Sequence, residues 1–249
     1  MKFWKAYRNQ IFAAILVIPV IIVMADWTCY CQIYRHSGKM CVYDLIGLGM
    51  QNVVTVMVFV LFLVIYPFKE QFRSTVLVRQ CKVHKLWCKM IRRLVAIGIV
   101  YAGYFGSIVC IMPLMFTKDI CNWSDTNSFL FYKTGKVSEK FPSFVNMFAA
   151  CYVTVFAAFL ISGMIMLFVW WYTQTPIVGY IVSIGFAILD YTGFHIYFAN
   201  TSMSSFIISR EGIVIWKHYV FPILAVVLIF IVFSVLYRQR DMLKKDFQL

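Results

Sequence analysis

The stretch from Phe141 to Leu189, FPSFVNMFAACYVTVFAAFLISGMIMLFVWWYTQTPIVGYIVSIGFAIL, decides the fold because it contains no charged residue. Its only obvious break is Thr173-Gln174-Thr175-Pro176. A membrane helix needs about 20 apolar residues, so this stretch is long enough for two crossings joined by a tight hairpin. The next residue is Asp190, an acid where the second crossing would still lie in hydrocarbon.

The composition of the whole chain predicts an integral membrane protein. Hydrophobic residues make up 62% of the chain, charged residues 13%, and the mean hydropathy is +0.81. A soluble domain cannot cover itself with so little polar surface. We therefore expect one all-α, polytopic transmembrane domain over residues 1–249. Its six helices are predicted at about 11–27, 45–67, 94–116, 144–171, 177–198 and 219–237.

The distribution of charge predicts the orientation of these spans. Most of the 23 Lys and Arg residues fall in the N-terminus, in residues 69–93 and in the tail 238–245. Positively charged loops stay in the cytoplasm, so both termini are expected there, and six spans fit this parity. The net charge of +13 is then explained by orientation and by contact with anionic lipid, without a nucleic-acid partner. A cleaved signal peptide is the competing interpretation of the basic N-terminus, but no small-residue cleavage site follows the apolar run.

The inner loop, residues 68–93, contains the most specific motif. Glu70 stands just past the second span and near a helix start, where the helix dipole favours a carboxylate. The spacing predicts a short amphipathic helix along the inner membrane surface. Its apolar and basic positions fall on different faces, with Phe72, Val76 and Leu77 on one face and Arg73 and Arg79 elsewhere. The alternative is a basic loop that only fixes topology.

This order of features resembles the permease subunit of a type-2 ABC exporter. The resemblance rests on the basic N-terminus, the six spans, the loop Glu70-Gln-Phe-Arg-Ser-Thr75 followed by Arg79, and the ending Tyr237-Arg-Gln-Arg-Asp241. It implies that Glu70–Val78 is a coupling helix that docks into a separate ATPase subunit. The chain departs from the family in its N-terminal elbow helix, which is reduced to residues 1–10, and in Ser74, where a glycine is common.

The resemblance also implies partners, location and substrate class. Six helices are half of the usual twelve, so a second permease copy or a related permease is expected. The chain has no G-x-x-x-x-G-K-[ST] loop, so ATP and Mg²⁺ would bind the partner ATPase, and no cofactor is expected here. The substrate would be a lantibiotic-like antimicrobial peptide or another amphipathic molecule, exported across a bacterial cell membrane. Signatures of hydrolytic enzymes are missing from the sequence, so we expect a transport subunit and not an enzyme.

Asp190 is the acid that lies inside a predicted span. Counting from Ile177 places it about 20 Å along the fifth helix, on the side of Gly179, Ser183 and Ala187. An ionisable group at this depth usually faces the bundle interior or water, so Asp190 is a candidate for a substrate path or gate. The alternative is a hydrogen-bonded packing residue.

The sequence alone decides neither the redox state of the cysteines nor between the exporter and two other function classes. Four cysteines, Cys29, Cys31, Cys41 and Cys121, fall in predicted outer loops, where they can form a disulfide or remain free thiols. The other function classes that fit the sequence are a six-span sensor that signals through its basic inner loop and an ion-coupled secondary transporter. Co-purification with an ATPase subunit would separate the exporter from both.

Overall fold

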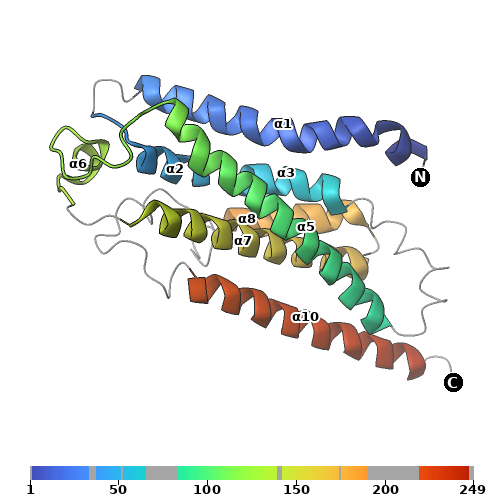
Figure 1. Cartoon of the computed structure of the whole chain (residues 1–249). Coiled ribbons are helices and arrows are strands. Elements are labelled where there is room, and N and C mark those ends of the chain that lie inside the picture. Colours follow the sequence, from blue (N-terminus) through green and yellow to red (C-terminus); the bar gives the residue numbers. More distant parts are fainter. Residues whose placement is uncertain are drawn as a thin grey trace.

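A computed structural model shows the chain as a bundle of helices that run back and forth between two ends (Figure 1). The structure describes residues 2–33, 38–51, 53–65, 83–138, 142–173, 175–189 and 219–246. The elements in these ranges are α1 (Lys2–Ile33), α2 (Val42–Gln51), α3 (Val53–Ile65), α5 (Val83–Ile111), the 3₁₀ helix η2 (Met112–Met115), α6 (Phe129–Thr134), α7 (Phe144–Thr173), α8 (Pro176–Leu189) and α10 (Phe221–Asp246). Within this part of the chain all named elements are helical, and β pairing is limited to a bridge between Lys39 and Ser128.

Among the described residues, three helices are long and apolar enough to cross a membrane, as judged by length and composition. They are α1 over Ile15–Gln32, α5 with η2 over Trp87–Met115, and α7 over Phe144–Thr173. Shorter apolar helices occupy Pro176–Phe186 and Phe221–Leu236. The predicted helical class is therefore confirmed, and the long apolar helices are compatible with the predicted membrane protein. Described helices lie in each of the six segments predicted as spans.

Two helices begin earlier than the spacing of charges predicts. α1 starts at Lys2 and not near residue 11, because its first turns contain no glycine or proline. α5 starts at Val83, inside the predicted inner loop 68–93. The reason is a buried face at helical spacing, on which Trp87, Met90 and Leu94 are all fully buried.

α7 is the central helix of the bundle. It packs against α3, α5, α8 and α10, and 78% of its apolar window is buried, whereas only 17% of the α1 window is. Small residues let its neighbours approach closely. A Cβ atom added to Gly179 of α8 would lie 2.6 Å from the carbonyl oxygen of Met166 in α7. At Gly179, α8 therefore packs closely against α7 within this chain.

The two ends of the bundle differ in chemistry. α1 and α5 begin and α10 ends at one end, where the turn between α7 and α8 also lies (Figure 1). We call this the basic end, because Lys89, Arg92 and Arg93 are exposed there on α5. α6, the start of α2 and the start of α7 lie at the opposite end, which we call the α6 end (Figure 1).

Candidate functional site

All the site residues predicted from the sequence lie outside the described part of the chain. This applies to the coupling residues Glu70, Phe72, Arg73, Val76, Leu77 and Arg79 and to the candidate gate Asp190. The described residues instead form two other candidate sites. One is a polar cluster at the α6 end, and the other is an apolar cavity between α1, α3 and α5.

Two chain segments that are distant in sequence lie side by side at the α6 end. The Lys39 N–H donates to the Asn127 carbonyl at 2.8 Å, and the Phe129 N–H donates to the Lys39 carbonyl at 3.1 Å. Further along the same segment, where α2 begins, the Val42 N–H donates to the Asp119 carbonyl at 2.9 Å. These bonds fix the segment before α2 against the segment after η2.

Asp44 lies beneath this junction and is fully buried. One carboxylate oxygen accepts the Cys41 N–H at 3.0 Å, and the other accepts the Trp123 indole N–H at 2.9 Å. Asp44 lies in the first turn of α2, where the helix dipole also favours a negatively charged carboxylate. Burial nevertheless raises the pKa of Asp44 above its ordinary value, since the hydrogen bonds offset only part of the desolvation.

Two cysteines from the joined segments meet beside this carboxylate. The thiols of Cys41 and Cys121 lie within hydrogen-bonding distance of each other, and the Cys41 thiol also reaches Asp44. Burial raises the pKa of Cys41. The hydrogen bond from Cys41 lowers the pKa of Cys121, which also accepts the Trp123 backbone N–H. Cys41 is fully buried and Cys121 is only half-buried, so Cys121 is the more reachable and the more acidic thiol.

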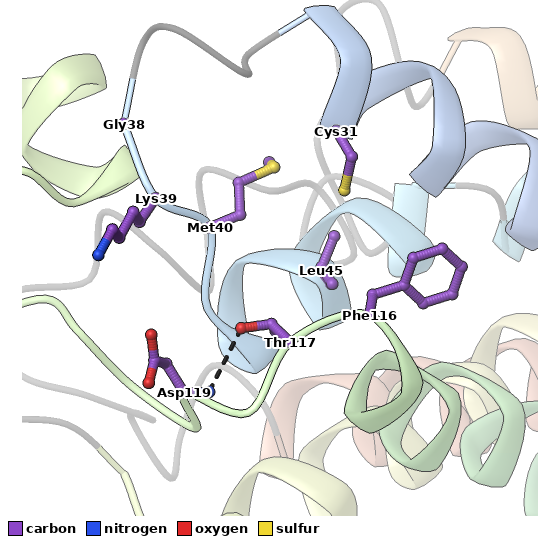
Figure 2. Close-up of a pocket in the computed structure, with 8 residues that line it drawn as sticks. All are labelled: Cys31, Gly38, Lys39, Met40, Leu45, Phe116, Thr117 and Asp119. Carbon is purple, nitrogen blue, oxygen red and sulfur yellow. Dashed lines mark hydrogen bonds between the residues drawn. The ribbon is translucent and has the colours of Figure 1, made fainter.

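A small pocket of about 270 Å³ lies next to this cluster. In Figure 2 the thiol of Cys31, from the end of α1, points into the pocket above Leu45 of α2. The pocket is lined by Cys31, Gly38, Lys39, Met40, Leu45, Phe116, Thr117 and Asp119. Gly38 has φ +138°, and an added Cβ would lie 3.0 Å from the Ser128 backbone, so only glycine fits at this wall.

The second candidate site is a cavity of about 740 Å³ between α1, α3 and α5. Its volume falls within the roughly 300–1,000 Å³ that is usual for ligand pockets. The wall is almost entirely apolar, and Arg93 at the basic end is the charged group among its described lining residues. The lining residues are Phe12, Ile15, Leu16, Val60, Val64, Arg93, Ala96, Ile97, Val100, Tyr101 and Tyr104.

Two tyrosines contribute hydroxyl groups to this mostly apolar cavity. The Tyr104 hydroxyl donates to the Leu16 carbonyl and so connects α5 to α1. The Tyr101 hydroxyl is buried and has no hydrogen-bond partner among the described residues, although its ring packs against Phe105 and Phe159. A buried hydroxyl without a partner is costly, so the Tyr101 hydroxyl is available to a ligand in the cavity.

Comparisons of the chain with protein-family models, with curated proteins and with solved structures found no match. Sequence reasoning placed Cys41 and Cys121 in outer loops but had no signal for their pairing. It assigned Arg93 to the inner loop and did not single out Asp44 or Trp123.

Proposed function

We propose that this protein is the membrane subunit of an ATP-driven exporter for an amphipathic substrate, and that the cavity between α1, α3 and α5 receives the apolar part of that substrate. The cavity is the observation that carries the proposal. It combines an apolar wall, a cation at one end and a buried hydroxyl for which the described part of the chain supplies no hydrogen-bond partner. Such a wall with a few fixed polar points is typical of sites for amphipathic small molecules.

The charge of Arg93 specifies the headgroup. Arg93 is exposed and lines the cavity at the basic end, where the guanidinium can bind a carboxylate or phosphate through two parallel hydrogen bonds. An acyl chain lying along α5 would place its anionic group at this arginine. The cavity thus favours an anionic amphiphile over a cationic antimicrobial peptide, which Arg93 would repel.

The membrane arrangement belongs to the same proposal. α1, α5 and α7 would be joined by three further crossings, made by α2 with α3, by α8 with the residues after it, and by α10. The basic end would then face the cytoplasm of a bacterial cell, with both termini inside. A separate ATPase subunit would dock at Glu70–Val78, and a second permease would complete the transporter.

Photo-crosslinking with a diazirine-bearing fatty acid tests the cavity. The full chain in lipid vesicles is expected to carry the adduct on residues such as Val64, Ile97 and Val100. Arg93→Glu should reduce this labelling about tenfold, because one charge-assisted hydrogen-bonded contact is worth roughly 1.5–3 kcal/mol. Arg92→Glu is the matched control, since Arg92 is also exposed but is not among the residues that line the cavity. Equal labelling of both variants would overturn the assignment.

Purification from native membranes tests the exporter. An ATPase subunit should co-purify with the chain, and Glu70→Arg combined with Arg73→Glu should abolish stimulation of its ATP hydrolysis. Fatty-acid labelling of the cavity without any associated ATPase would instead indicate a ligand-binding sensor or an ion-coupled transporter.

A further inference from the structure

We propose that Cys41 and Cys121 are a redox-active pair whose thiols close into a disulfide, tying the segment before α2 to the segment after η2. The proposal rests on three observations: the contact between the two thiols, the backbone hydrogen bonds that hold their segments together, and the adjacent buried carboxylate of Asp44. It does not depend on the proposed transport function, but it uses the predicted orientation in which the basic end faces the cytoplasm.

The backbone brings the two cysteines together before any covalent bond forms. Cys41 directly precedes Val42, whose N–H binds the Asp119 carbonyl, and the Tyr43 N–H binds the Ile120 carbonyl at 3.3 Å. Cys121 follows directly after Ile120. Both cysteines carry free thiols in this structure, and the hydrogen bond between them places the two sulfur atoms next to each other.

The location of the pair matches the compartment in which disulfides persist. It lies at the α6 end, and the charge distribution predicts that the basic end faces the cytoplasm. The α6 end then faces the oxidising side of the membrane, where structural disulfides form. A second thiol pair, Cys110 and Cys151, is also in contact, but both residues are fully buried within the helix bundle. An aqueous oxidant cannot reach that pair.

The first step of closure takes place at the more exposed thiol. Cys121 is half-buried, and the hydrogen bond from Cys41 together with the Trp123 backbone N–H stabilises its thiolate. This thiolate attacks a disulfide oxidant of the form R–S–S–R, a class that includes small-molecule and protein disulfides. A bond forms between Cys121 and one RS group, and the other group leaves as a thiolate.

The second step uses the buried thiol and the carboxylate. Asp44 accepts the proton of the Cys41 thiol, with which it is in hydrogen-bond contact. The Cys41 thiolate then attacks the Cys121 sulfur, the Cys41–Cys121 bond forms, and the second RS group leaves as a thiolate. The two cysteines lose two electrons and two protons, and the oxidant is reduced to two RSH molecules. Asp44 thus acts as the base that accepts the Cys41 proton when the disulfide closes.

Peptide mapping of the full chain tests the pairing. Isolated membranes are treated with oxidised glutathione, remaining thiols are blocked with N-ethylmaleimide, and the digest is analysed before and after reduction. We expect a linked peptide pair that contains Cys41 and Cys121 and disappears on reduction. Cys121→Ser should abolish it, whereas Cys29→Ser and Cys110→Ser should leave it intact. Recovery of Cys41 and Cys121 only as separately alkylated peptides, or of Cys41 linked to Cys31, would overturn the proposal.

Two further variants test the role of Asp44. Asp44→Asn should slow ring closure at least tenfold and so accumulate the glutathione adduct on Cys121. Trp123→Phe, which removes the indole hydrogen bond to Asp44 but keeps the base, should accumulate far less of this adduct. Wild-type closure rates in Asp44→Asn would exclude Asp44 as the proton acceptor. The wild-type peptide map needs no variant, so the pairing remains testable even if a variant folds poorly.

Discussion

The Trp123 indole N–H donates a 2.9 Å hydrogen bond to a carboxylate oxygen of Asp44, and the two residues are 79 positions apart in the sequence. Both side chains are buried. This contact connects the start of α2 to the segment after η2 within the helix bundle. It also places a buried carboxylate in the same small region as two thiols, so it fixes both the stability and the chemistry of the α6 end.

Trp123→Phe removes this hydrogen bond and leaves one buried carboxylate oxygen without its donor. Removing one partner of a buried bond exposes the full desolvation cost of the other, so the free energy of unfolding should fall by about 1–3 kcal/mol. Thermal unfolding in detergent measures the change. Trp87→Phe is the matched control, because that indole donates a 3.2 Å bond to the neutral Ser234 hydroxyl. A loss for Trp123→Phe no greater than that of the control would contradict the prediction.

The buried carboxyl of Asp44 predicts a specific dependence of stability on pH. Burial raises its pKa in the folded protein above the ordinary value of 3.8, so the folded state holds this proton to higher pH than the unfolded state does. The stability that Asp44 contributes is therefore greatest below the unfolded pKa and is lost as pH rises through the folded pKa.

The unfolding midpoints of the wild type and of Asp44→Asn, measured in parallel from pH 4 upward, isolate this contribution. We expect the wild type to lose stability relative to Asp44→Asn as the pH increases. A difference between the two proteins that stays constant, or that changes in favour of the wild type with rising pH, would show that the folded pKa is not raised.

Gly179 in α8 allows the close approach to α7. Because an added Cβ would lie 2.6 Å from the backbone oxygen of Met166, Gly179→Ala forces the two helices apart. We expect a loss of about 1–3 kcal/mol in the free energy of unfolding. Gly185→Ala on the same helix is the matched control, since no atom of the described residues lies within 4 Å of its added Cβ. The control should be neutral or should stabilise by up to about 1 kcal/mol, because alanine is the better helix former. Equal unfolding midpoints for the two variants would refute the packing argument.

The helical class of this chain was predictable because it depends on local composition. The uncharged run 141–189 predicted a hairpin of two helices, and α7 and α8 lie there with Thr173 and Pro176 at the turn. The start of α5 was missed because the charges of Arg92 and Arg93 suggested a loop. The buried face around Trp87 decides that boundary, and charge alone does not reveal it.

The candidate sites were much less predictable, because they are made by contacts between distant segments. Nothing in the residues around Cys41 indicates that Cys121 will lie against it. The same holds for Asp44, which stands just before the predicted span 45–67 but which packing buries completely. Only the placement of the segment after η2 against the start of α2 creates these contacts. The coupling helix and Asp190 lie outside the described residues and remain predictions.

The two tyrosines of the large cavity allow stability to be separated from ligand binding. The Tyr101 hydroxyl is buried and has no partner among the described residues, so Tyr101→Phe removes an unsatisfied group and should leave the unfolding midpoint unchanged or raise it. The same variant should weaken photo-labelling by the diazirine fatty acid, because the ligand loses a hydrogen-bond partner. Tyr104→Phe should instead destabilise the folded protein. It removes the bond to the Leu16 carbonyl between α5 and α1, so the free energy of unfolding should fall by about 1 kcal/mol. If Tyr101→Phe instead lowers the unfolding midpoint and leaves labelling intact, its hydroxyl serves the fold and not a ligand.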